Sequence, residues 1–98
     1  MLNILIVCNA GMSSGILARK MQEEAKGEAT VKAVGVGDYL DHLEGIDMIL
    51  VGPQIRFQLK EIRENSNLPA VTINLAKYGL MDAKGILEDS IQFYKGVK

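Results

Sequence analysis

The chain has 98 residues, of which 48 % are hydrophobic and 23 % are charged, and its net charge is -1. This balance predicts one globular domain over residues 1–98 and gives no general attraction to nucleic acid or to an anionic membrane. The single cysteine excludes an intrachain disulfide, and no apolar run approaches the roughly 18 residues that a membrane span needs. Because the N-terminus also lacks the basic start of a signal peptide, we expect a cytoplasmic protein without direct membrane insertion.

The N-terminal segment predicts a strand, a loop and a helix. Residues 2–7 are apolar apart from Asn3, as in a strand that is buried on both faces. The loop that follows begins with the cysteine and contains small residues. A helix is then expected over residues 13–26, ended by Gly27, and its inner face would consist of Ile16, Leu17, Met21 and Ala25.

The rest of the chain continues to alternate strands and helices. We expect strands at 29–36, 47–51 and 69–73, and helices at 39–44, 53–65 and from Asp82 onward. This alternation predicts an α/β fold: a single open four-stranded parallel sheet with helices on both faces. The loops after the strands then share one edge, where ligands bind in such sheets. Four side chains could converge there: Cys8, Asp38, Gln54 and Tyr78.

The loop over residues 8–15 has the properties of a phosphate site. Small residues leave backbone N–H groups accessible, Gly11 allows the chain to turn inward, and the following helix adds the positive end of its dipole. A lone cysteine is usually a small core residue, but this surrounding favours a nucleophile at Cys8. Ser13 is a candidate helix N-cap as well as a donor, and Met12 is either a partner contact or a core residue.

Several chemistries are excluded by the motifs that are missing. The sequence has no Walker loop, no dinucleotide fingerprint and no C-x-x-C pair. Cys8 and His42 make a poor metal site, and His42 is expected at the surface, so we predict no metal and no cofactor. Low-molecular-weight tyrosine phosphatases carry C-x5-R-[ST] at this strand end, but the sixth residue after Cys8 is Ser14. Without that arginine and without a D-P motif, we expect a site that accepts a phosphoryl group and keeps it intact instead of hydrolysing it, as a carrier does.

Three stretches carry a resemblance to a known family. Residues 8–14, 52–57 and 78–82 are similar to the lactose/cellobiose-type enzyme IIB of the bacterial phosphoenolpyruvate-dependent sugar phosphotransferase system (PTS). This resemblance implies a fold similar to that of the low-molecular-weight tyrosine phosphatases. It also implies that Cys8 takes a phosphoryl group from a phosphohistidine of enzyme IIA and passes it to a sugar held by the membrane-embedded enzyme IIC.

The resemblance also implies a set of phosphate-binding residues. They follow the cysteine directly: Asn9, Ala10, Gly11, Met12, Ser13, Ser14 and Gly15. The family often has a bulkier residue at position 15. The imported sugar would be a β-disaccharide such as cellobiose, lactose or chitobiose, and the chain is expected to be a monomer. Two alternatives are a phosphatase relative and a regulatory module that reports phosphorylation to a partner.

Overall fold

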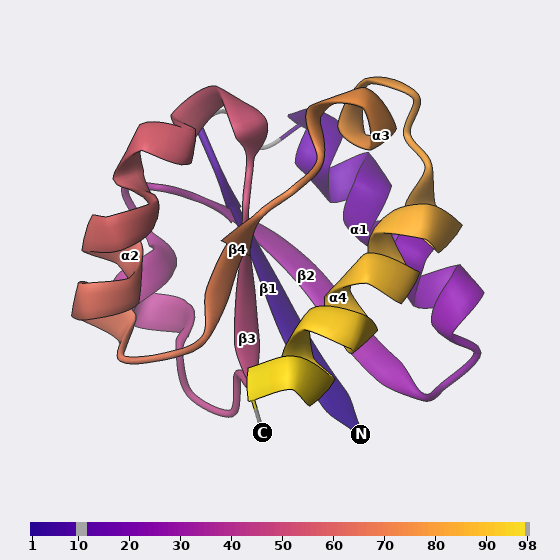
Figure 1. Ribbon diagram of the computed structural model, residues 1–98, viewed down its shortest axis with the longest axis horizontal. Helices are drawn as coiled ribbons and strands as arrows, with labels where there is room; N and C mark the ends of the chain where they lie inside the picture. The colour runs from indigo at the N-terminus through magenta and orange to yellow at the C-terminus, as the bar shows by residue number, and fades with distance from the viewer. Residues whose placement is uncertain (10–11, 98) are drawn as a thin grey trace.

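The computed structural model describes residues 1–9 and 12–97, and in this part of the chain four parallel strands form one open sheet (Figure 1). The strands are β1 (Leu2–Cys8), β2 (Ala29–Gly35), β3 (Met48–Val51) and β4 (Ala70–Thr72), in the order β2-β1-β3-β4. The α-helices are α1 (Met12–Ala25), α2 (Leu59–Ser66), α3 (Leu75–Gly79) and α4 (Ala83–Val97), with 3₁₀ helices η1 (Tyr39–His42) and η2 (Pro53–Gln58). The predicted α/β class and parallel sheet are confirmed.

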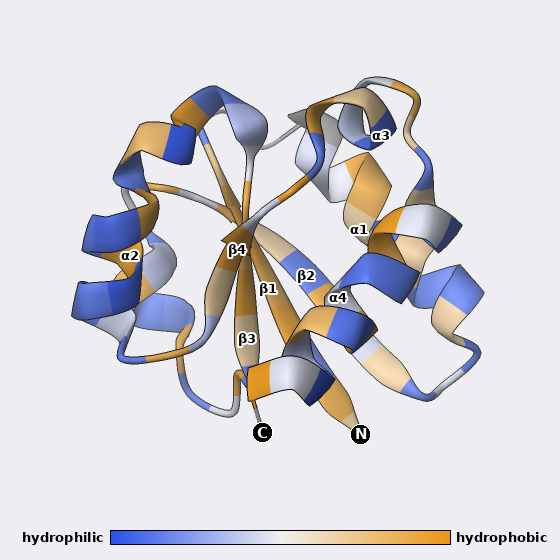
Figure 2. Cartoon of the chain, viewed as in Figure 1, coloured by the Kyte–Doolittle hydropathy of each residue, from blue (hydrophilic) through white to orange (hydrophobic). Residues whose placement is uncertain are grey.

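Both faces of the sheet are covered, so strand side chains alternate between two apolar clusters. Ile4 and Ile6 of β1 pack in one cluster with residues of α1 and α4. Leu5 and Val7 pack in the other with residues of η2 and α2. Figure 1 shows α1 and α4 on one side of the sheet and α2 on the opposite side. Figure 2 shows that the strands are the most apolar part of the chain. By the same alternation, Cys8 belongs to the face covered by α1.

Helix α1 differs in three details from the expectation. It begins at Met12, so Ser13 lies inside the first turn and is not the N-cap. Ile16 is 47 % exposed, and its predicted inward position is therefore wrong. The buried face of the helix consists of Leu17, Ala18, Met21 and Ala25. Ile16 lies beside this face and is partly exposed to solvent. The helix ends at Ala25, one residue before its predicted end, and Lys26 (φ +51°) and Gly27 (φ +85°) then turn the chain.

The chain after β3 and β4 is more segmented than its apolar periodicity indicates. The helix expected over 53–65 is divided, because Ile55 has a non-helical backbone (φ −119°, ψ 28°) between the start of η2 and α2. The loop expected at 74–80 contains the short helix α3, which Asn74 caps by accepting a hydrogen bond from the backbone N of Lys77 at 3.0 Å. The predicted cap Asp82 is confirmed, since its carboxylate accepts from the backbone N of Gly85.

Candidate functional site

Cys8 lies where the connections from neighbouring strands diverge. Strand β1 is central in the sheet, and the chain leaves β1 toward α1 on one face and leaves β3 toward η2 on the other. The loops after β2 and β3 are tied to this point: the backbone N of Val36 donates to the carbonyl of Cys8, and that of Gly52 donates to Val7, both at 2.8 Å. In open parallel sheets this switch point is the place where ligands bind.

The thiol of Cys8 has a hydroxyl partner in the first turn of α1. Cys8 Sγ lies 2.7 Å from Ser14 Oγ, and the two residues are 2 % and 0 % exposed. The first turn of α1 carries no acidic side chain, so the positive end of the helix dipole is not neutralised there. A negatively charged group on the sulfur would therefore lie close to the Ser14 hydroxyl and to the N-terminus of α1.

The other predicted phosphate-binding residues are placed unequally. Asn9 is exposed, and so is Gly15, around whose missing side chain there is open space. Ala10 and Gly11 lie outside the described residues, as do the side chains of Met12 and Ser13. Their contacts with a phosphoryl group, and the partner contact considered for Met12, stay predictions.

Of the side chains expected to converge on Cys8, Gln54 and Tyr78 do so. The Tyr78 side chain is hydrogen-bonded to Gln54. Burial raises the pKa of Tyr78, the charge on Cys8 raises it further, and the Gln54 hydrogen bond lowers it. Asp38 is exposed beside Gly35 of the neighbouring strand, where it starts η1. His42 is exposed in η1, as predicted.

Gly52 is a site residue that sequence reasoning treated only as part of a loop. A Cβ atom at this position would lie 3.0 Å from Cys8 Cβ and 3.2 Å from Gln54 Oε1. Glycine therefore lets the loop after β3 pass directly against the cysteine. The only signal in the sequence was the glycine that follows a buried strand, which is typical of a close backbone approach.

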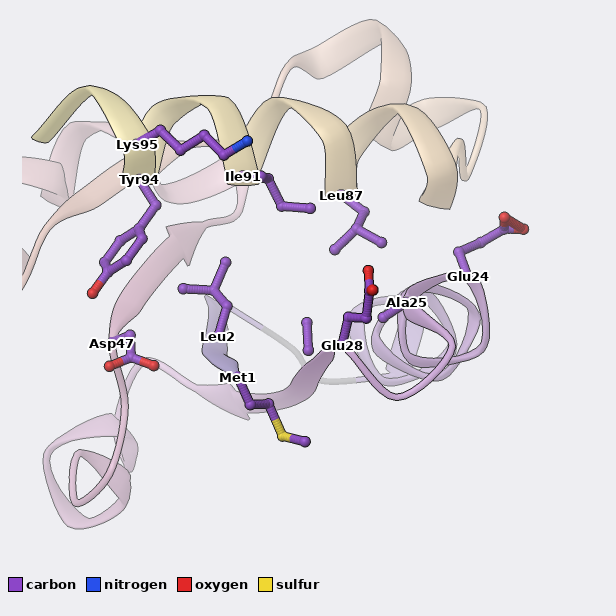
Figure 3. A pocket seen from close by; sticks show the side chains of 11 residues that line it. Met1, Leu2, Glu24, Ala25, Glu28, Asp47, Leu87, Ile91, Tyr94 and Lys95 are labelled. Atoms are coloured by element: carbon purple, nitrogen blue, oxygen red, sulfur yellow. The ribbon is translucent and has the colours of Figure 1, made fainter. Parts of the chain in front are cut away.

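A cavity of about 590 Å³ opens at the opposite end of the sheet (Figure 3). Leu2, Leu87, Ile91 and Tyr94 form its walls, with Glu28 and Lys95 among the charged residues around it. It is lined by the beginnings of β1 and β2, whereas Cys8 stands at the end of β1. The cavity therefore plays no part in the chemistry of the cysteine.

Neither a metal site nor a membrane span is found in the described part of the chain. Residues 1–9 and 12–97 contain no cluster of three or more histidine, cysteine or acidic side chains that could hold a metal ion. Within the same ranges, no helix has the length and apolar character to cross a bilayer.

The fold and this site define an α/β domain of the low-molecular-weight tyrosine phosphatase type, with a cysteine at the end of the first strand. Residues 3–89 match the family model described as the lactose/cellobiose-specific IIB subunit of the PTS. The chain therefore belongs to this family, whose members act as phosphotransferase components of sugar transport.

Similar proteins agree with this assignment. The chain is 32 % identical over 97 residues to the oligo-beta-mannoside-specific EIIB component of Bacillus subtilis, covering 93 % of this chain and 94 % of that protein. It is 31 % identical to a lactose-specific EIICB component of Staphylococcus epidermidis, over 76 % of this chain and 13 % of that longer protein. A solved cellobiose-specific IIB component from Borrelia burgdorferi has a TM-score of 0.75 and 31 % identity, over 97 % of this chain and 93 % of that one.

Proposed function

We propose that this protein is a cytoplasmic phosphocarrier in which Cys8 takes a phosphoryl group from a phosphohistidine of enzyme IIA. Cys8 then passes the group to a sugar that enzyme IIC is importing. The observation that carries the proposal is the pair formed by Cys8 Sγ and Ser14 Oγ, 2.7 Å apart at the start of α1. Ser14 occupies the position of the phosphatase arginine, so the site offers donors for a phosphoryl group without the fork that supports hydrolysis.

The first transfer exchanges an N–P bond for an S–P bond. The thiol proton passes to water, the sulfur attacks phosphorus, and the N–P electron pair returns to the imidazole of the donor as the bond breaks. Ser14, the loop N–H groups and the α1 dipole stabilise the charge that builds on the phosphoryl oxygens. Burial of Cys8, which is 2 % exposed, limits the access of water to the phosphocysteine.

The second transfer regenerates the cysteine. A sugar hydroxyl oxygen attacks phosphorus and forms the O–P bond, the S–P electron pair stays on sulfur, and the hydroxyl proton is released. Because the site holds the phosphoryl group with neutral donors and a helix dipole, the group stays transferable. A loop arginine would bind the same group more strongly and oppose its release.

Exposed apolar side chains on the elements that follow three of the strands fit a surface that partner proteins contact. Ile16 in α1, Phe57 in η2 and Leu80 just after α3 are 47 %, 78 % and 80 % exposed. These three elements follow the ends of β1, β3 and β4, at the edge of the sheet where Cys8 lies (Figure 1). Large exposed apolar side chains are typical of an interaction site. We assign this face to enzyme IIA and enzyme IIC in turn.

The names of the relatives guide the choice of sugar. They include oligo-beta-mannoside-specific, lactose-specific and cellobiose-specific components. We propose a β-linked disaccharide such as cellobiose, lactose or chitobiose. The Staphylococcus relative named EIICB supports enzyme IIC as the second partner. We propose that the chain works as a monomer, because a carrier that alternates between two partners must present one face to both.

The test is the intact mass of the protein after incubation with phosphoenolpyruvate, the general phosphotransferase proteins and an active cognate enzyme IIA. The proposal predicts one phosphoryl adduct on the wild type, with the acid and base lability expected of a thiophosphate ester, and none on Cys8→Ser. An unmodified wild type beside a fully phosphorylated enzyme IIA would refute the carrier function. An adduct that persists in Cys8→Ser would refute the choice of residue.

A further inference from the structure

Tyr78 is a buried side chain at the edge of the site. It is 9 % exposed and lies in α3, directly after β4. Its backbone N donates to the carbonyl of Asn74 at 2.9 Å, and the neighbouring Lys77 forms an ion pair of 2.7 Å with Asp89 of α4. The backbone bond closes the short helix on its cap Asn74, and the ion pair links the helix to α4.

The phenol oxygen is connected to the cysteine through the loop after β3. Gln54 is hydrogen-bonded to Tyr78, and Gln54 Oε1 lies against Gly52 on the same side as Cys8 Cβ. Gln54 carries an amide N–H that can donate to the phenol oxygen. The hydroxyl proton of Tyr78 is then left for another acceptor, and charge on Cys8 acts on this hydroxyl.

We propose that Tyr78 is a phosphoryl-binding residue: its hydroxyl donates a hydrogen bond to the phosphoryl group on Cys8, and Gln54 positions the phenol oxygen for that purpose. This inference rests on the proposed carrier function. Tyr78 would supply a side-chain donor from the segment after β4, whereas the loop over residues 8–15 has no arginine. A neutral donor stabilises the phosphoryl oxygens without adding a positive charge that would retain the group.

The protonation state of Tyr78 fits this role. Burial and the charge on Cys8 both raise its pKa above the ordinary value of a tyrosine, so the phenol is protonated at neutral pH. A negatively charged phosphoryl group on Cys8 acts in the same direction. Tyr78 therefore stays a donor when the carrier is loaded, which is the state in which the hydrogen bond forms.

The test compares wild type, Tyr78→Phe, Gln54→Ala and Tyr39→Phe after phosphorylation through enzyme IIA. Tyr39 is a matched control: it is 4 % exposed, and its hydroxyl accepts from the Asn65 side-chain amide at 3.1 Å. It packs in the cluster on the sheet face opposite to α1. Both phenylalanine variants therefore lose the hydroxyl of a buried tyrosine, but only Tyr78→Phe changes the site around Cys8.

The readout is the ³¹P chemical shift of the phosphocysteine as a function of pH, together with the initial rate of phosphorylation. A lost hydrogen bond to the phosphoryl group raises the pKa of that group by about 1 in Tyr78→Phe and slows transfer about tenfold. Gln54→Ala, which keeps the hydroxyl, changes both quantities in the same direction by less. Tyr39→Phe leaves both at their wild-type values.

The outcomes separate this inference from the function on which it rests. A wild type that accepts no phosphoryl group refutes the carrier function. Normal loading of the wild type, with a Tyr78→Phe titration and rate equal to those of the wild type, refutes only the role of Tyr78. Equal changes in Tyr78→Phe and Tyr39→Phe would also refute it, because the effect would then be one of general stability.

Discussion

Replacing Gly52 by alanine tests whether the loop after β3 must touch the cysteine. Gly52 has φ of −58° and ψ of 142°, which any residue adopts, so the effect is one of space alone. The new Cβ would lie 3.0 Å from Cys8 Cβ and 3.5 Å from Cys8 Cα. Since carbon atoms pack best at about 3.5–4.0 Å, Cys8 or the loop must move by roughly 0.5 Å.

The surrounding structure resists this movement. β1 is a central strand, and backbone hydrogen bonds of 2.8 Å join Val7 to Gly52 and Cys8 to Val36. Overpacking at a site of this kind costs about 1–3 kcal/mol of the free energy of unfolding. The same shift displaces the sulfur from Ser14 and lowers the rate at which Cys8 accepts a phosphoryl group.

The assay is equilibrium unfolding in urea together with the initial rate of phosphorylation, and Gly37→Ala is the control. Gly37 is exposed, and a Cβ atom added there would have no neighbouring atom within 4 Å. Alanine at this surface position therefore changes stability by less than about 0.5 kcal/mol. If Gly52→Ala unfolds at the same urea concentration as Gly37→Ala and is phosphorylated as fast as the wild type, close contact at Gly52 is not required.

Three further changes have defined outcomes. Gly15→Ala, in open space within α1, raises the free energy of unfolding by about 0.5–1 kcal/mol in urea titrations, and a decrease would contradict the helical account of this residue. Ser14→Ala removes the hydroxyl 2.7 Å from Cys8 Sγ and slows phosphorylation about tenfold in the initial-rate assay; an unchanged rate would exclude Ser14 from the site. Because the pKa of Tyr78 is raised in the folded state, the unfolded chain loses this proton first, and stability falls as pH rises above about 10. Unfolding at a series of alkaline pH values should give a weaker fall for Tyr78→Phe, and identical curves would show that Tyr78 does not titrate differently on folding.

The parallel sheet was predictable because its signals are local and repeated. The apolar run of β1, the alternating strand and helix patterns and the loop glycines all indicate the same architecture. The edge where Cys8, Gln54 and Tyr78 meet follows from topology, since parallel strands end on one side. The order of strands and helices was therefore enough to predict that these residues lie at the same edge of the sheet.

The details that sequence reasoning missed depend on packing between distant segments. Ile16 fits the helical period of α1, yet it is exposed because the stripe through Leu17 and Met21 is the one that meets the sheet. The non-helical backbone of Ile55 interrupts the helical segment inside η2, and apolar periodicity does not record such a break. The contact of Gly52 with Cys8 is set by the pairing of β1 and β3, which lies beyond any local motif.

Cys8 is proposed to carry a phosphoryl group and to pass it on to a sugar. The most direct measurement isolates the phosphorylated protein and mixes it with membranes that contain the partner enzyme IIC, with and without a β-disaccharide. We expect the protein to return to its unmodified mass only when the sugar is present, with an equal amount of sugar phosphate formed. Release of inorganic phosphate at the same rate without sugar would contradict the carrier function and favour a phosphatase.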